Sequence, residues 1–214
     1  MFKKLILIRH GESIWNRQNR FTGWANVELT KIGKIQAKKT GELLLKHNIL
    51  PEICFTSNLN RSIDTNKIIL NSMGINDIPI IKSWRLNEKH YGKLTGYHKE
   101  YDIKWKGEYF DIPPVINSFN GLDINGNKLY NPKFGESYYM TFLRVYPLWK
   151  MIIPKILNGK NPIICSHKNS IKVLIQHLEN LNIKNINNIE VPNAEPIIYY
   201  FDDNMKLISK KNLK

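Results

Sequence analysis

Two histidines and two arginines stand directly or closely after apolar runs of the sequence. Arg9 and His10 follow the run LILI, and His167 follows PIICS. Arg61 comes soon after Ser57, the last residue of EICFTS. A transferring phosphoryl group spreads negative charge over its peripheral oxygens, which arginine binds with planar donors that are always charged. Because a neutral imidazole is also a nucleophile that divides one difficult transfer into two easier steps, these residue types predict phosphoryl chemistry.

A lone histidine after a strand more often has a structural role, so the prediction depends on all of these residues meeting. In open α/β sheets, ligands bind outside the carboxyl ends of the strands, where helix N-termini favour anions. Arg9, His10, Arg61 and His167 follow their apolar runs at equivalent places. We therefore expect them to converge at one edge of a sheet.

The segments that would position these residues alternate between strand-like and helical patterns. Strands are expected at 2–9, 52–57, 78–84, 161–166 and 196–201, and helices at 29–48, 59–74, 136–157 and 168–181. The alternation is typical of a three-layer α/β sandwich, with a mostly parallel central sheet and helices on both faces. Residues 196–201 are expected to form the final strand.

Local signals mark the ends of several elements. Thr30 should cap the first long helix, and Gly74 should cap the C-terminal end of the second. Pro147 and Pro154 should bend or divide the helix at 136–157. Between about 85 and 135 the pattern gives way to aromatics, glycines and prolines, which predicts a lid-like excursion from a single domain spanning 1–214.

A general acid is also needed to protonate the leaving oxygen, and Glu88 is the best candidate. It lies in WRLNEKHYG, directly after the strand expected at 78–84. The alternative is a solvated glutamate in a loop. Glu12, Glu100 and Glu136 compete on composition, but none has the same placement.

The charge balance of the chain allows several kinds of partner. The 214 residues include 32 basic and 18 acidic ones, a formal net charge of +14. Such a charge suits nucleic acid, an anionic membrane surface or a small phosphorylated substrate. The lysines are scattered, however, and richness in Ile, Asn and Lys is what an AT-rich genome produces without selection for a partner. We expect a small phosphorylated substrate, and neither nucleic acid nor membrane.

The cysteines and apolar segments predict where the protein resides. Cys54 and Cys165 lie in apolar runs, which suggests buried thiols in a reducing compartment. The N-terminal apolar run is too short for a signal peptide, and no stretch is long and apolar enough to span a bilayer. A cytoplasmic protein is expected.

With these residues in place, a family resemblance follows. The segment LIRHGESIWN matches the signature of the histidine phosphatase superfamily. FTGW, LTKIGKIQA, TSNLNRSIDT, WRLNEKHYGKLTGYHK and HKNSIKVLIQHLE resemble segments of the 2,3-bisphosphoglycerate-dependent phosphoglycerate mutases, in the same order and spacing. The similarity covers nearly the whole chain, and FTGW with the WRLNE segment is its most specific part.

The resemblance implies a role for each matching position. It implies that His10 becomes phosphorylated, that Glu88 donates and accepts the proton, and that His167 stabilises the transition state. Arg9 and Arg61 would complete the catalytic set. The implied substrate-binding residues are Arg9, His10, Gly11, Glu12, Ser13, Ile14, Trp15, Asn16, Thr22, Gly23, Arg61, Glu88, Lys89, His90, Tyr91, Lys99, Lys168 and Asn169.

The activity implied is the interconversion of 3-phosphoglycerate and 2-phosphoglycerate, primed by 2,3-bisphosphoglycerate. No metal is expected, because no cluster shows ligand spacing, and relatives suggest a homodimer or homotetramer. One alternative is a histidine phosphatase for small phosphorylated metabolites, in which water intercepts the phosphohistidine. Another is a degenerate protein that only binds phosphorylated ligands, although the intact catalytic residues argue against it.

The sequence departs from the mutase pattern at four places, and these keep the phosphatase alternative open. Lys104 and Lys106 stand where the family has paired arginines, in a segment several residues shorter. Lys168 stands where the family has a glycine, and a glycine there permits close approach of the backbone to phosphate. PNAEP places Glu195 where we expect an anion site, and the sequence ends at FDDNMKLISKKNLK without the family's basic tail.

Overall fold

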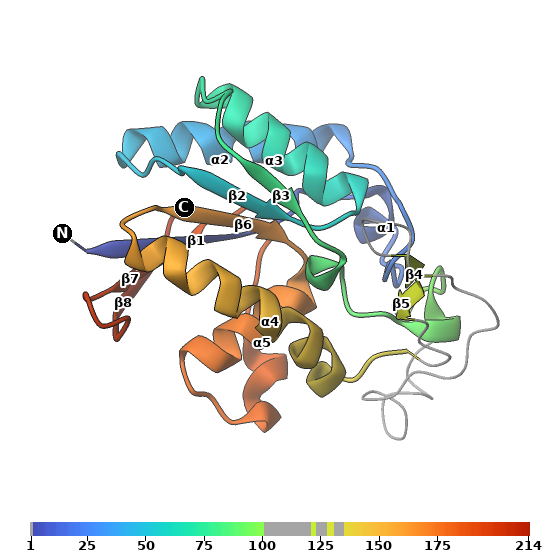
Figure 1. Cartoon of the computed structure of the whole chain (residues 1–214). Helices are drawn as coiled ribbons and strands as arrows, with labels where there is room; N and C mark the ends of the chain where they lie inside the picture. Colours follow the sequence, from blue (N-terminus) through green and yellow to red (C-terminus); the bar gives the residue numbers. More distant parts are fainter. Residues whose placement is uncertain (1, 101–120, 123–127, 131–134) are drawn as a thin grey trace.

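A six-stranded sheet forms the centre of the described residues, which are 2–100, 121–122, 128–130 and 135–214 of this computed structural model (Figure 1). Its strand order is β3-β2-β6-β1-β7-β8; the first four strands are parallel, and β7 and β8 are antiparallel to their neighbours. The strands are β1 Lys3–Arg9, β2 Ile53–Thr56, β3 Ile80–Lys82, β6 Pro162–Ser166, β7 Ile197–Phe201 and β8 Leu207–Asn212. The expected mostly parallel sheet is confirmed.

Side chains alternate across β1, so that this one strand contributes to two cores. Leu5 and Leu7 belong to the core under α4 and α5, whereas Ile6 and Ile8 belong to the core under α2 and α3. The long helices are α2 Lys31–Lys46, α3 Asn60–Ser72, α4 Tyr138–Leu157 and α5 Lys168–Leu178. Figure 1 shows the two pairs on opposite faces of the sheet, which confirms the three-layer sandwich.

Helix α4 runs without interruption through both of its prolines. A proline removes one hydrogen bond to the carbonyl four residues earlier, here those of Leu143 and Lys150. Pro147, Pro154 and these two partners are all exposed, so water can satisfy the freed carbonyls. The opposite face of α4 is buried against the sheet. Of the expectation that the prolines bend or divide this helix, division is therefore wrong, and a bend stays a prediction.

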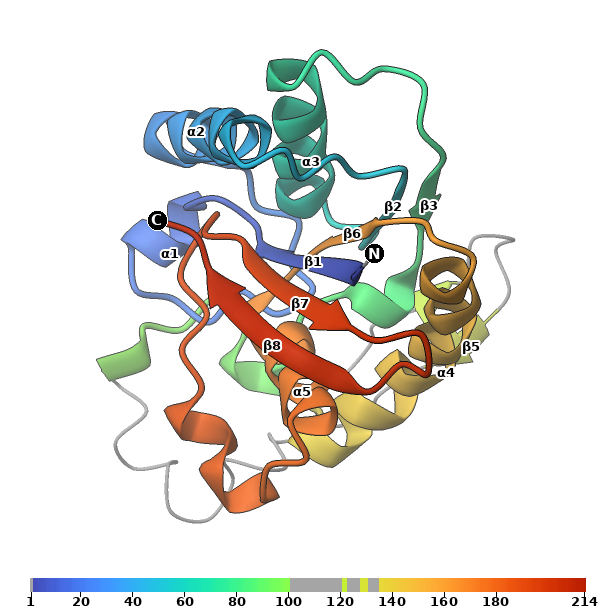
Figure 2. The ribbon, with the colours of Figure 1, turned by 90° about the vertical axis from the view of Figure 1, so that its left-hand side faces the viewer.

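The chain continues past the strand expected to be last. β7 is followed by the antiparallel β8, which Figure 2 shows beside it at the edge of the sheet. The strand predicted at 196–201 is confirmed as β7, but the prediction that it is the final strand is wrong. Apart from Leu207, β8 is exposed along its length and contains the adjacent residues Lys210 and Lys211, so it lacks the alternation that reveals a half-buried strand.

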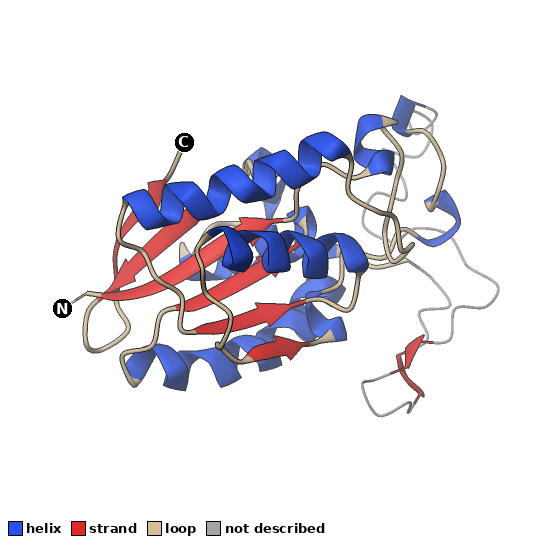
Figure 3. Ribbon diagram, turned by 90° about the horizontal axis from the view of Figure 1, so that it is seen from above, coloured by secondary structure: helices blue, strands red, loops and turns tan. Residues whose placement is uncertain are grey.

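Most of the lid-like excursion expected at about 85–135 lies outside the described residues, as do Lys104 and Lys106. Its described part includes a small antiparallel pair of strands, which Figure 3 shows apart from the central sheet. The short elements, none of them predicted, are α1 Ile14–Arg17, η1 Trp84–Leu86, η2 Gly92–Leu94, β4 Gly121–Leu122, β5 Lys128–Tyr130 and η4 Ile183–Asn188.

The start of α2 presses against the segment that follows His10. Thr30 Oγ1 accepts a hydrogen bond from Gly33 N at 2.9 Å, which confirms the expected cap. A Cβ added to Gly33 would lie 2.1 Å from the Glu12 carbonyl oxygen, and one added to Gly11 would lie 2.3 Å from the Gly33 carbonyl oxygen. Neither position has room for a side chain. This backbone contact holds the segment after His10 against α2.

The predictions for Gly74 and for the burial of the two cysteines are also confirmed. Gly74 follows α3 with a φ of 69°, and its N–H donates to the Asn71 carbonyl, as expected of a C-terminal cap. Cys54 and Cys165 are buried and free, and burial raises the pKa of both thiols. Within the described ranges, no helix is both long and apolar enough to cross a membrane.

Candidate active site

Three neighbouring strands of the sheet deliver side chains to one edge. β1 leads into His10, β6 into His167, and β2 into Ser57. The His10 backbone N–H donates to the Ser166 carbonyl at 2.9 Å, which extends the β1–β6 pairing by one residue. As a result the two imidazole rings lie with their centroids 4.9 Å apart. The structure thus brings the two histidines together.

A cavity opens beside these histidines, and it is strongly cationic. Its described lining residues include five arginines or lysines but one carboxylate, that of Glu88. The lining consists of Arg9, His10, Asn16, Arg20, Thr22, Arg61, Glu88, Tyr91, Lys99 and Lys168. Such a lining favours a multiply charged anion.

His10 is arranged to act as a neutral nucleophile. Burial lowers the pKa of its imidazole well below 6.5, and the nearby guanidiniums of Arg61 and Arg9 lower it further. Its Nδ1 lies 2.7 Å from the Gly11 carbonyl oxygen, which can only accept, so Nδ1 carries the proton. The lone pair therefore remains on Nε2, the nitrogen available to attack phosphorus.

Arg61 and Arg9 each have a buried donor atom that no described residue binds. Arg61 is fully buried and donates from its two Nη atoms to the carbonyls of Ala25 and Gly23, at 2.7 and 2.8 Å. Arg9 donates from Nη1 to the Val191 carbonyl at 3.0 Å. Burial lowers the pKa of Arg61 to about 10, which leaves it charged at neutral pH. The Nε atoms of both residues are buried without a hydrogen-bond partner among the described residues, and an anion in the cavity would supply one.

The Glu88 carboxylate is held by backbone donors on one side. Its Oε1 accepts from the N–H groups of Lys89 at 2.8 Å and Asn169 at 3.1 Å. No described residue donates to Oε2, so this oxygen is free to bind a substrate hydroxyl. The Glu88 carbonyl oxygen also accepts from Trp24 Nε1. A carboxylate positioned in this way meets the geometric requirement for a general acid and base.

A buried ion pair between Arg144 on α4 and Glu136, two residues before α4, supports the loop that carries Glu88. Arg144 Nε lies 2.6 Å from Glu136 Oε1, and Arg144 also donates to the carbonyls of Arg85 and Glu88, at 2.6 and 2.9 Å. Glu136 Oε2 accepts from the His90 N–H at 2.8 Å. Glu136 is therefore fully engaged, and it does not line the cavity. Arg144 was not predicted, and its only signal is a charged residue within the apolar run of α4.

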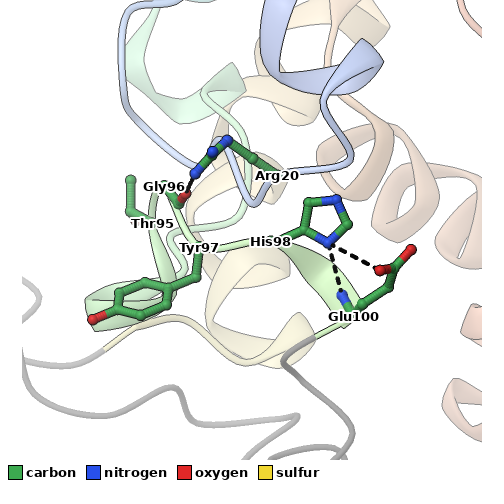
Figure 4. A pocket seen from close by; sticks show the side chains of 6 residues that line it. All are labelled: Arg20, Thr95, Gly96, Tyr97, His98 and Glu100. Carbon is green, nitrogen blue, oxygen red and sulfur yellow. Dashed lines mark hydrogen bonds and ion pairs between the residues drawn. The ribbon is translucent and has the colours of Figure 1, made fainter.

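The other competing carboxylates also lie away from the cavity lining. Glu12 forms an ion pair with Arg17 at 2.9 Å and accepts from Thr30 Oγ1. Glu100 lies at a second hollow, which Figure 4 shows together with Arg20 and His98. Among the four glutamates weighed from the sequence, Glu88 is the one that lines the cavity.

Several of the sequence-predicted binding residues surround the cavity without lining it. Ser13 is fully buried and caps α1, where it exchanges hydrogen bonds with Asn16. Asn169 donates from Nδ2 to the Tyr91 hydroxyl at 2.6 Å, and Lys89 Nζ lies 4.5 Å from the centroid of the Tyr138 ring. The predicted residues outside the lining are Gly11, Glu12, Ser13, Ile14, Trp15, Gly23, Lys89, His90 and Asn169.

Two residues near the cavity were not predicted, and one predicted neighbour lies elsewhere. Arg20, directly before FTGW, lines the cavity and donates to the Gly96 carbonyl at 2.7 Å (Figure 4). Asn193 donates from Nδ2 to the His10 carbonyl at 2.7 Å. Glu195 lines a separate hollow with Lys39, so the expectation that it stands at the anion site is wrong.

The buried histidines predict how stability depends on pH. The pKa values of His10 and His167 are lowered well below 6.5, and that of His90 to about 4, chiefly by burial. Below pH 6.5 the unfolded chain binds protons that the folded protein does not, so stability falls as the pH falls. Each histidine should cost about 1.4 kcal/mol per pH unit. The free energy of unfolding measured in urea should therefore fall by about 4 kcal/mol between pH 7.5 and pH 5.5. An unchanged value would contradict this.

Sequence comparison places this geometry in a known family. The model of the histidine phosphatase superfamily (branch 1) matches residues 5–214. The chain belongs to the histidine phosphatase superfamily. This confirms the resemblance seen in LIRHGESIWN.

Relatives within the histidine phosphatase superfamily match nearly the whole chain. The 2,3-bisphosphoglycerate-dependent phosphoglycerate mutase of Blochmanniella floridana is 43% identical, over 96% of this chain and 95% of the relative. The protein of that name from Hamiltonella defensa is 37% identical, over 97% of this chain and 90% of the relative. Bacillus stearothermophilus YhfR has a similar fold, with a TM-score of 0.75 at 23% identity over 96% and 94% of the two chains. A mycobacterial glucosyl-3-phosphoglycerate phosphatase also has a similar fold, with a TM-score of 0.72 at 21% identity over 99% of this chain and 97% of that one.

Proposed function

We propose that this protein is a 2,3-bisphosphoglycerate-dependent phosphoglycerate mutase, an isomerase of glycolysis and gluconeogenesis. Relatives with that name share 35–43% of their residues with it over nearly their whole length. The observation that carries the proposal is the cavity itself, where neutral His10 faces the guanidiniums of Arg9 and Arg61 and the Glu88 carboxylate. A nucleophile, anion donors and an acid–base group are the parts that phosphoryl transfer through an enzyme intermediate requires.

The chain's own residues divide the transfer into two half-reactions. His10 Nε2 forms a bond to phosphorus while the bond from phosphorus to the leaving oxygen breaks, and Glu88 gives that oxygen its proton. In the second half, Glu88 takes the proton of a substrate hydroxyl as the hydroxyl oxygen displaces Nε2 from phosphorus. Arg9 and Arg61 bind the peripheral oxygens in both directions, and each has a free Nε–H to do so. Transfer to the free hydroxyl of 3-phosphoglycerate gives the bisphosphate, and the isomer released depends on which of its two phosphoryl groups then returns to His10.

The residues present fit the primer, 2,3-bisphosphoglycerate, which supplies the first phosphoryl group to the resting enzyme. Thr22 Oγ1 is buried without a hydrogen-bond partner among the described residues, as are the Nε atoms of Arg9 and Arg61. Lys99 and Lys168 also line the cavity and add positive charge for a second anionic group. A ligand with two phosphoryl groups would satisfy both sets of donors.

One assay tests the proposed function against its alternatives. Purified protein is incubated with 3-phosphoglycerate, with and without primer, and 2-phosphoglycerate and inorganic phosphate are measured separately. A mutase should form 2-phosphoglycerate in a reaction that depends on the primer, and it should release much less phosphate. Phosphate as the main product would replace the proposal with a phosphatase. Absence of both products, with retained ligand binding, would indicate a binding protein.

Lys168 is expected to bind substrate where other members of the family have glycine. It lines the cavity, and its pKa is lowered by burial and by the charge of Arg9. Lys168→Gly should weaken affinity for 3-phosphoglycerate by up to about fivefold, since an exposed ion pair contributes about 0.2–1 kcal/mol. Lys168→Gln is the control, because it removes the charge without placing glycine in the first turn of α5. Titration calorimetry at low and moderate salt measures the change, and tighter binding by the glycine variant would contradict it.

We also propose that residues 1–214 act as one cytoplasmic domain that needs no metal, with small phosphoglycerates as partners and neither nucleic acid nor membrane. The homodimer or homotetramer expected from the resemblance stays a prediction, which analytical ultracentrifugation would test. If the enzyme needs no metal, its activity should survive exhaustive treatment with a chelator.

A further inference from the structure

Ser57, the residue that follows β2, is the one side chain of the described structure that forms a hydrogen bond to the His167 ring. It is fully buried, and its Oγ lies 2.8 Å from His167 Nε2. The same oxygen accepts a hydrogen bond from the Leu59 N–H at 3.2 Å. Ser57 therefore joins the start of α3 to His167, the histidine beside His10.

The direction of the Ser57–His167 hydrogen bond follows from the donors and acceptors present. A serine hydroxyl carries one proton, and a buried hydroxyl needs an acceptor for it. Leu59 N–H is a donor, so it cannot take this proton. His167 Nε2 is the remaining described partner and must be the acceptor. A neutral imidazole that accepts at Nε2 carries its own proton on Nδ1.

The Nδ1 atom of His167 is a buried donor without a partner. It has no hydrogen bond among the described residues, although its ring lies 4.9 Å from that of His10. Burial lowers the pKa of His167 well below 6.5, as do the charges of Arg61 and its other neighbours, so the ring is neutral. One N–H is then all the ring can donate, and the tautomer decides which nitrogen holds it.

We propose that Ser57 is a positioning residue that fixes His167 as the tautomer with its proton on Nδ1, ready to donate to an oxygen of the phosphoryl group at His10. This proposal rests on the proposed function for the identity of the acceptor. The assignment of the tautomer is independent of the proposed function, because the tautomer is a property of the free protein. An N–H aimed at an oxygen where charge develops stabilises the transition state more than the ground state.

Nitrogen NMR of the free protein tests the tautomer without any substrate. The protein is labelled with ¹⁵N-histidine, and the His167 signals are assigned by their loss in His167→Gln. The wild type should show a protonated Nδ1 and an unprotonated Nε2 for this ring. Ser57→Ala should shift the population toward the Nε2-protonated form, and Ser57→Thr should preserve the wild-type pattern. A wild-type His167 protonated on Nε2 would overturn the proposal, whatever the enzyme's activity.

Kinetics then separate positioning from a merely structural role. Ser62 is the matched control, because it is also fully buried in this region and donates to the Cys165 carbonyl instead of a histidine. Ser57→Ala should lower kcat by about tenfold or more with little change in KM, the scale expected for losing one oriented hydrogen bond. Ser62→Ala should leave kcat near that of the wild type. Equal effects of the two changes, or a Ser57→Ala effect confined to KM, would overturn the positioning role.

Discussion

Replacing His10 with alanine should abolish both mutase and phosphatase turnover and remove all acid-labile phosphate from the protein. His10 is the residue whose free nitrogen lies beside Arg9 and Arg61, and its Nδ1 is occupied by the Gly11 carbonyl. Among the described residues that line the cavity, His10 is the one histidine, so none of the others could take over the attack. Removing the nucleophile of a covalent mechanism typically costs on the order of 10⁶-fold in rate.

The measurement combines turnover with labelling. Protein is incubated with ³²P-labelled primer, and the label is located by mass spectrometry after mild digestion at alkaline pH. His47→Ala is a suitable control, because His47 is an exposed residue at the end of α2. Label on a residue other than His10, or turnover retained by His10→Ala, would contradict the assignment.

Glu88→Gln should slow phosphoryl transfer by about 10²–10⁴-fold, the contribution typical of one positioned acid or base. Glutamine can keep its carbonyl oxygen at the place of Oε1, where the N–H groups of Lys89 and Asn169 donate. Its amide nitrogen would then occupy the place of Oε2, which in the wild type accepts no hydrogen bond from described residues. The loop should keep its shape, and only proton transfer should be lost.

Binding and chemistry must be measured separately for this variant. Calorimetry with 3-phosphoglycerate should give an affinity close to that of the wild type, while single-turnover labelling of His10 should be slow. A variant with weakened binding and unchanged transfer would show that Glu88 binds substrate and does not move protons.

The fold was predictable because each layer leaves a local pattern. The apolar run of β1 supplies both cores, and the spacing of apolar residues in α2 and α4 follows the helical repeat. The same rules placed His10 and His167 at one edge of the sheet. They failed for β8, whose residues are mostly exposed. They also failed for the prolines of α4, which leave the helix undivided because they and the carbonyls they free are exposed to water.

The supporting residues of the site were harder to predict, because their contacts join distant parts of the chain. Arg144 reaches the Glu88 carbonyl across 56 positions of sequence, and Asn193 reaches the His10 carbonyl across 183. A sequence pattern records which residues share a helix face or a strand, but it does not record these pairings. For Glu195 the error was to expect a residue at the site that is not there. Its neighbour Asn193 contacts the His10 carbonyl, but Glu195 itself lines a separate hollow.

The contact between Gly11 and Gly33 limits how this protein can change by mutation. A side chain at either position would collide with the backbone of the facing segment, at the Gly33 or the Glu12 carbonyl. A side chain that is too large can be accommodated by a smaller residue opposite, but glycine has no side chain to shorten. No pair of exchanges at these positions restores the fit, so the two glycines cannot drift together. We therefore expect functional variants of this protein to keep both glycines.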